Sequence, residues 1–435
     1  DKLPVMLSKA IFIGSMSRYS EAVTYARSAF QLCGKSLPTN PGPLQMIWKV
    51  SIIRRLTARL TDDDIVKLPA VTDKKVNFML QLYSRVGTYA SMIDRRQLLV
   101  WCTLQAIQLS LAHGLSSATP MAFALLGIVE LVFGNFKAAV RFGRLSTRLV
   151  EERELGPEAM ATTYARACCF VLHWSESLDG PLSRLPKSGM EIDGLEGELK
   201  YKFLSAANHF VLNQVRGMPL GVVERDARDA CLKMKEFNLK SPLTIAKPQW
   251  QYILNLLGQS ENPLVLSGEA MDETEHLSDP TIQGSSTFRM ILTFQKFRLA
   301  RLLGSYELAE QHATFLTKQF KDYPIKTGFV VYDVKFNLAL LWYHCARESR
   351  GGIRRRMYLS KARGEMNFMK RTRAKGCPNF DTMLPLLEAE EASCVLSEQP
   401  LAVDALYVAA IASASGKPHH QAIALEQTAL YHIGR

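Results

Sequence analysis

Residues 121–139 read MAFALLGIVELVFGNFKAA, an apolar run that ends at Gly134 and is followed by Asn135, Phe136 and a new helical pattern containing Ala139. Glycine adopts the left-handed conformation that closes a helix without steric cost. Small residues such as Ala139 let a second helix approach the first closely, and an aromatic residue at its start fills the space between neighbouring helix pairs. The stretch therefore predicts two antiparallel helices joined by a tight turn.

The same phrase recurs along the chain. It is present as Gly14-Ser15 before Tyr19, as Gly304-Ser305-Tyr306 and, in weaker form, at 217–219 and 416–418. The distances between the glycines fall near multiples of roughly 40 residues, slightly more than one tetratricopeptide unit. We expect an all-α fold of tetratricopeptide-like antiparallel helix-pair repeats that form a superhelical array, with these turn glycines: Gly14, Gly134, Gly217, Gly304 and Gly416.

Helical periodicity is found over most of the chain, and no sustained alternation of apolar and polar residues indicates a strand. The spacing predicts helices over residues 98–112, 288–303 and 331–346, the first two closed by Gly114 and Gly304. In the third helix we expect one apolar face, formed by Tyr332, Phe336, Ala339, Leu340 and Tyr343.

The length of 435 residues exceeds what a single core usually organises. We divide the chain into an N-terminal helical-repeat half at 1–180, central helix pairs with long loops at 181–285, and a C-terminal helical-repeat half at 286–435. One continuous array is favoured over independent domains. Loops are expected at 36–43, 177–197 and 260–286, and the acidic residues between 269 and 279 should lie in solvent.

The composition, 47% hydrophobic and 22% charged, is typical of folded protein and unlike that of a disordered chain. The longest apolar run, Met121 to Gly134, is too short to span a bilayer. The eight cysteines contain no CxxC pair, which favours a reducing compartment and a cytoplasmic location. Because the chain starts at Asp1 and ends inside a helical pattern, we expect it to be a segment of a longer protein.

Positive charge is concentrated between residues 350 and 375, where Glu365 is the only acid in a chain of net charge +12. A solvated helix face or a subunit contact is the favoured interpretation. An acidic protein partner comes second and nucleic acid third, because the interleaved Met and aromatic residues have core-like spacing. The candidate basic interaction surface consists of Arg354, Arg355, Arg356, Arg363, Lys370, Arg371 and Arg373.

The sequence predicts no catalytic, cofactor-binding or metal-binding residue. Gly34-Lys35-Ser36 resembles the end of a phosphate-binding loop, but Ala29 stands where its first glycine would be. Asp62-Asp63-Asp64 could suggest a divalent cation, yet acids after Thr61 are better explained as the start of a helix. The adjacent His419 and His420 lack the spacing of a zinc site.

Two phrases resemble a known family. Residues 248–260, PQWQYILNLLGQS, and 268–273, GEAMDE, are similar to the helical region of large multidomain signalling proteins, as are Leu44 and Trp48 after Gly34. Such proteins join a protein-kinase-like domain, an AAA-type ATPase, this helical region, and GAF and histidine-kinase or cyclase modules. The resemblance implies a non-catalytic sensor or scaffold region that contacts protein partners or neighbouring domains. A freestanding peptide-binding adaptor and, less favoured, a nucleic-acid-binding helical array are the alternatives.

Overall fold

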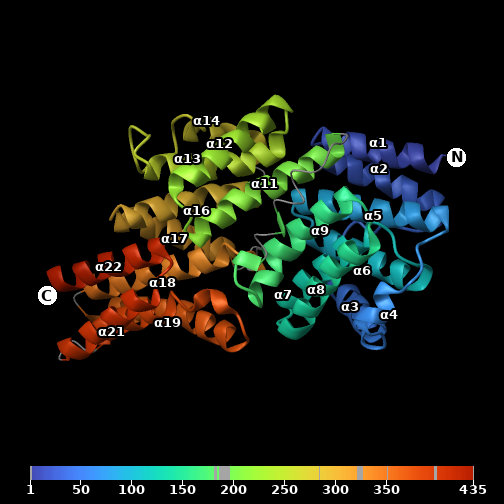
Figure 1. The fold of residues 1–435 in the computed structure, drawn as a ribbon. Coiled ribbons are helices and arrows are strands. Elements are labelled where there is room, and N and C mark those ends of the chain that lie inside the picture. The colour runs from blue at the N-terminus through green and yellow to red at the C-terminus, as the bar shows by residue number, and fades with distance from the viewer. Residues whose placement is uncertain are drawn as a thin grey trace. The chain divides into compact units, whose positions relative to one another are not determined.

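The computed structural model describes residues 2–180, 184–185, 196–283, 285–320, 327–349, 351–395 and 399–434. Over these ranges the fold is all-α, as predicted (Figure 1). The only extended pairing in them is an isolated bridge between Ala70 and Leu115. None of the helices in the described ranges is both long and apolar enough to cross a bilayer.

The chain forms two compact units. Unit 1 contains Asp1–Leu172 and Ser183–Asn208, and unit 2 contains His173–Leu182 and His209–Arg435. Residues 209–285 and 286–435, which the sequence-based division separated, therefore group together. Helix α11, Glu196–Arg216, contributes residues to both units.

Unit 1 is built mainly from helices that pack against their neighbours in sequence. Its pairs are α1 with α2, α5 with α6 and α7 with α8. In the last pair, α7 and α8 are joined only by residues 133–135, so two helices that pack side by side must run antiparallel. The helices are α1 Leu3–Ser15, α2 Tyr19–Leu32, α3 Pro43–Ala58, α4 Asp62–Val66, α5 Lys74–Met92, α6 Arg96–His113, α7 Thr119–Val132, α8 Phe136–Arg153 and α9 Pro157–Phe170.

Unit 2 is also built from helices that pack against their neighbours in sequence. At its centre, α18 packs against α16, α17, α19 and α20. The pairs α12 with α13, α16 with α17, α18 with α19 and α20 with α21 are consecutive in sequence (Figure 1). Its elements are η1 Leu172–Trp174, α12 Leu220–Glu236, α13 Lys240–Leu256, α14 Glu273–Ser278, α15 Pro280–Gln283, α16 Ser286–Leu302, α17 Tyr306–Phe320, α18 Val331–Glu348, α19 Gly352–Ala374, η3 Pro378–Phe380, α20 Leu384–Val395, α21 Pro400–Ser413 and α22 Pro418–Ile433.

The three helices predicted individually are confirmed as α6, α16 and α18. The five residues expected on the apolar face of α18 are all buried. However, Val334, Leu338 and Trp342, on other sides of the helix, are buried as well. Helix α18 is therefore enclosed by its neighbours and does not have a solvent face of the usual width.

The turn glycines differ in what they do. Gly134, Gly217, Gly304 and Gly416 follow helices with φ of 77°, 89°, 72° and 83°. Gly14 departs from the prediction, because it lies inside α1 and Ser17, with φ of 60°, makes the turn. A Cβ atom at Gly14 would lie 2.2 Å from Cζ of Tyr89. Glycine is thus required there for close packing against α5, and the sequence phrase alone did not distinguish the two roles.

Candidate functional site

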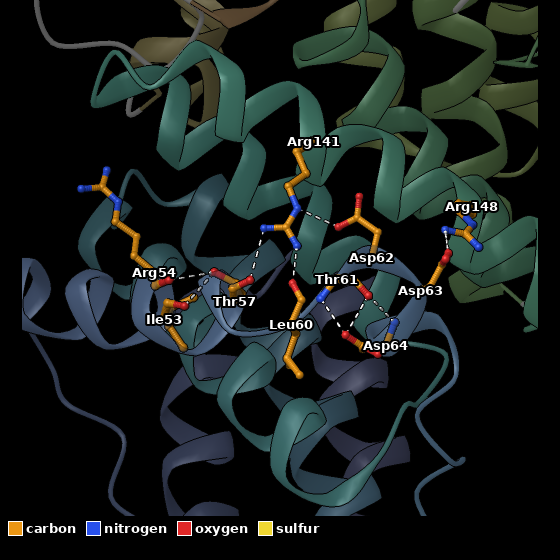
Figure 2. Close-up of polar contacts among 10 residues, drawn as sticks. All are labelled: Ile53, Arg54, Thr57, Leu60, Thr61, Asp62, Asp63, Asp64, Arg141 and Arg148. Atoms are coloured by element: carbon orange, nitrogen blue, oxygen red, sulfur yellow. Dashed lines mark hydrogen bonds and ion pairs between the residues drawn. The ribbon is translucent and has the colours of Figure 1, made fainter.

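The three aspartates at residues 62–64 form the beginning of α4 in unit 1 (Figure 2). Thr61 Oγ1 accepts a hydrogen bond from the Asp64 backbone N–H at 3.1 Å, and Asp64 Oδ2 accepts from the Thr61 N–H at 2.8 Å. This is a capping box, which satisfies backbone N–H groups at a helix start. The hydrogen bond from the Thr61 side chain lowers the pKa of Asp64. The capping interpretation of this acidic run is supported.

The other two aspartates are bound by arginines of α8. Arg141 Nε donates to Asp62 at 2.7 Å, and its other nitrogens donate to the carbonyls of Thr57 at 3.2 Å and Leu60 at 2.8 Å. These carbonyls lie at the end of α3, where a cation complements the helix dipole. Arg148 lies 2.6 Å from Asp63 (Figure 2). Each acid has an internal partner, and the described residues contain no group of three or more His, Cys, Asp or Glu side chains placed so that they could hold a metal ion.

The predicted basic surface lies on α19 in unit 2, and several of its cations are compensated there. Ion pairs join Arg363 to Glu391 at 2.6 Å, Lys370 to Glu388 at 2.9 Å and Arg373 to Asp381 at 2.5 Å. Two of these acids belong to α20, which packs against α19. Much of the charge that the sequence displays is therefore neutralised within the unit.

None of the remaining four cations of the set has an ion pair in the described part of the chain. Arg355 donates to the carbonyl of Cys394 at 2.6 Å and Arg354 donates to the Tyr358 hydroxyl at 3.2 Å. Arg356 and Arg371 are exposed and form no ion pair with a carboxylate in the described part of the chain. A hydroxyl or carbonyl acceptor does not neutralise a guanidinium, so Arg354 and Arg355 also keep their positive charge. Arg371 likewise donates to a backbone carbonyl, that of Asn367, at 3.1 Å.

Exposed apolar side chains lie on the same face of α19 as Arg371, and Arg356 lies at the edge of that face. Ile353 and Met357 are 86% and 43% exposed, and Arg356 lies between them in sequence. Positions 353, 357, 360, 364, 367 and 371 advance by four, three, four, three and four residues, which places them along one helix face. Exposed apolar side chains therefore lie beside the basic residues of α19.

The phrases behind the family resemblance fold onto each other in unit 2. Gln251 of α13 is fully buried, and its side-chain nitrogen donates to Asn255 Oδ1 at 2.9 Å and to the Ser267 carbonyl at 3.3 Å. Its side-chain oxygen accepts from the Ala270 N–H at 3.0 Å. A Cβ atom at Gly268 would lie 2.7 Å from Gln251 Nε2. Glycine is therefore required at position 268, because any larger side chain would clash with Gln251.

Asn255 and Glu273 make further hydrogen bonds to the backbone of residues 263–273. Asn255 Nδ2 donates to the carbonyls of Pro263 at 3.1 Å and Val265 at 2.7 Å. Glu273 Oε2 accepts from the Leu266 N–H at 3.0 Å, and Glu273 is buried. The expectation that all acids between 269 and 279 are solvated is therefore wrong for Glu273. Because Gln251, Asn255 and Glu273 all bond to neighbouring backbone groups, these three residues of the two phrases stabilise the local fold.

Sequence reasoning did not find the buried arginines of α16. Arg298 donates to the side-chain oxygens of Gln214 at 3.3 Å and Gln295 at 3.2 Å, and its Nε lies 2.7 Å from Asp333 Oδ2. Its guanidinium also lies 4.2 Å from the ring centroid of Tyr252. Gln295 is on α16 itself, but Gln214, Tyr252 and Asp333 come from helices far apart in sequence, so no local pattern marks Arg298 as buried.

A cysteine, a histidine and an asparagine also meet in unit 2, a combination that can serve thiol catalysis. Here the His173 ring nitrogen Nδ1 lies 2.6 Å from the Tyr332 hydroxyl oxygen, and Asn379 Nδ2 donates to the His173 carbonyl at 2.7 Å. Cys377 is buried, lies 3.4 Å from the same hydroxyl oxygen, and has its pKa raised by burial. A buried thiol with a raised pKa is a poor nucleophile. The set therefore anchors residues 173–178 and does not form a reaction centre.

The remaining cysteines and the pair His419 and His420 are also explained by their packing inside the protein. All eight cysteines lie in described ranges and form no disulfide. His420 is buried and its Nδ1 lies 2.8 Å from Thr382 Oγ1, while its ring lies 4.0 Å from that of His419. Burial lowers the pKa of both imidazoles. The neighbouring rings pack in the interior of unit 2.

Comparison of the chain with protein-family models, with curated proteins and with solved structures found no match. The functional assignment consequently depends on the surface chemistry described above and on the sequence resemblance.

Proposed function

We propose that this chain is a non-catalytic helical-repeat sensor or scaffold region of a multidomain signal-transduction ATPase or kinase, in which it makes protein–protein or interdomain contacts. The signalling context comes from the resemblance of residues 248–273. The contact function is supported by one observation, the outer face of α19.

That face combines Arg356 and Arg371, which lack carboxylate partners in the described residues, with exposed Ile353 and Met357. Arginine and methionine are enriched in protein interfaces, where an apolar centre is combined with directional polar contacts. A nucleic-acid interface depends on many phosphate contacts from free cations. Since Arg363, Lys370 and Arg373 are already paired, a protein partner suits this face better.

The contact is tested by placing a photo-cross-linking amino acid at Met357 of the protein in its native cells. A matched position is Val408 on α21, which is also an exposed apolar side chain but has no cation on its helix. We expect a discrete protein adduct at Met357 that the double change Arg356→Glu and Arg371→Glu removes. Equal adducts at both positions, or an adduct removed by nuclease, contradicts the proposal.

The signalling part is tested separately in the native protein. The same double change should alter nucleotide turnover or kinase output, because it weakens an interdomain contact without touching the core. Unchanged output, together with a lost Met357 adduct, would leave protein binding in place and remove the regulatory role.

A further inference from the structure

Helix α3 of unit 1 presents an unusual line of side chains to solvent. Leu44, Trp48, Ser51, Arg55 and Arg59 are spaced by four, three, four and four residues, which places them on one helix face. Leu44 is 82% exposed and Trp48 is 63% exposed. The face thus begins with two large apolar side chains and ends with two arginines.

The exposure of this face is not a consequence of poor packing by α3. On the opposite side, Met46, Val50 and Ile53 are buried in the core of unit 1, and α3 packs against α6. Lys49 Nζ also donates to Gln108 of α6 at 3.2 Å. The helix therefore has a complete inner face and, in addition, an apolar outer one.

The charge on this face has no counterpart among the described residues. Arg55 and Arg59 are exposed and form no ion pair there. The acids closest along the chain, Asp62 and Asp63, are held by α8 arginines, as Figure 2 shows. Arg54, by contrast, is paired with Glu130 at 2.8 Å. The two outward arginines would be complemented by carboxylates from another molecule or domain.

We infer that this face of α3 binds an acidic amphipathic helix of a partner protein. Apolar side chains of that helix cover Trp48, Leu44 and the neighbouring Ile47, which is 56% exposed, and its carboxylates pair with Arg55 and Arg59. Trp48 and Arg55 are seven residues apart, about 10 Å along a helix. The partner helix therefore carries its acids about two turns beyond its apolar residues.

Charge also argues against a symmetric contact between two copies of α3. Residues 43–58 contain no Asp or Glu, so α3 packed against α3 would leave all four outward arginines unpaired. This inference goes beyond the proposed function, because it concerns a different unit and names the chemistry of the partner. The α19 face can fail its test without affecting it.

The test is a selection from a phage-displayed library of helical peptides on the full chain. The variants Trp48→Ala and Arg55→Glu with Arg59→Glu alter the face, and Lys233→Glu with Lys235→Glu on α12 provides a matched charge control. Circular dichroism and thermal unfolding check each variant, and all these side chains are exposed. Selected peptides are then synthesised with a fluorescent label and titrated by anisotropy.

We expect acid-rich amphipathic peptides whose affinity falls at least tenfold with Trp48→Ala and at least tenfold with the double arginine change, but is unaltered by the lysine control. Selection on the Arg55→Glu, Arg59→Glu chain should instead enrich basic peptides. The inference is overturned by peptides that bind Trp48→Ala equally well, by a consensus that ignores the charge reversal, or by a dimer in sedimentation experiments that Trp48→Ala dissociates.

Discussion

Helices α19 and α3 differ in how their positive charge is used. On α19, three members of the basic surface are paired with acids of α20 and of the turn before it, and four arginines remain without carboxylate partners in the described residues. On α3, one arginine is paired with a buried glutamate. Two others lie further along the helix face that carries the exposed side chains of Leu44 and Trp48. The number of basic residues in a helix is therefore a poor guide to the charge that its surface offers.

The largest expected effect comes from removing the buried acid of α20. Glu390 is fully buried, pairs with Arg347, and accepts from the Tyr407 hydroxyl at 2.8 Å. Glu390→Ala leaves a largely buried guanidinium and a buried hydroxyl without their partner, which should lower the free energy of unfolding by about 3 kcal/mol or more. Chemical denaturation measures this loss.

The control for that change is Glu388→Ala on the same helix. Its pair with Lys370 is about half exposed, so the expected loss is less than about 0.5 kcal/mol. Similar losses for the two variants would mean that α20 holds α18 and α19 mainly by apolar contacts.

A smaller effect is expected at the attachment of α3. Glu130 is fully buried and binds Arg54 through both carboxylate oxygens, each at 2.8 Å. Glu130→Ala should cost about 2 kcal/mol, because charge-assisted hydrogen bonds are lost while Arg54 can still reach water. Hydrogen exchange should then accelerate in α3 more than in α5. Glu130→Gln, which keeps the shape, should have a milder effect, and equal protection in both helices would contradict this role.

Low pH should destabilise unit 2 more than unit 1. Burial lowers the pKa of His312, His344 and His419 to about 4, and all three belong to unit 2. Between pH 6.5 and 4 the unfolded chain binds more protons at these sites, so stability falls as the pH falls. Since the side chains are partly exposed, we expect a loss of about 2 kcal/mol at pH 4 and full stability above pH 6.5.

Hydrogen exchange corrected for intrinsic rates, followed for each unit from pH 7 to pH 4.5, checks this expectation. Unit 2 should lose protection first. Replacing His344 by Phe should reduce the pH dependence, and a pH profile unaltered by that change would show that other groups control acid stability.

The smallest expected effect is at the corner between α3 and α4. Thr61→Ala removes the side-chain acceptor of the α4 capping box, which should cost about 1 kcal/mol. Thr61→Ser retains the acceptor and should have little effect. If both variants unfold at the same denaturant concentration as the unmodified chain, the ion pairs of Asp62 and Asp63 are sufficient to hold the corner.

The sequence predicted most of the fold because helix periodicity and glycine positions are local properties. Helices α6, α16 and α18 and the cap at Thr61 depend on residues within a few positions of each other. The role of Gly14 was missed because its reason is Tyr89, which is distant in sequence. Contacts of that kind leave no periodic signal.

The candidate surfaces were harder to predict for the same reason. Arg363 donates a hydrogen bond to Glu391, twenty-eight positions later in the sequence, and Arg298 donates one to Gln214, eighty-four positions earlier. Helix periodicity alone does not tell which of these arginines has a partner inside the protein and which one leaves its charge to solvent. Leu44 and Trp48 were noted only as part of a resemblance, since an apolar residue in a helix is usually buried.

The anchoring of residues 173–178 has a consequence for the order of synthesis. Unit 1 up to Leu172 leaves the ribosome early, but His173 bonds with Tyr332 and Asn379, which follow 159 and 206 residues later. The polar groups of this segment therefore reach their final partners only after most of unit 2 has been made. A chain that stops before Asn379 lacks the side chain that donates to the carbonyls of His173 and Glu176.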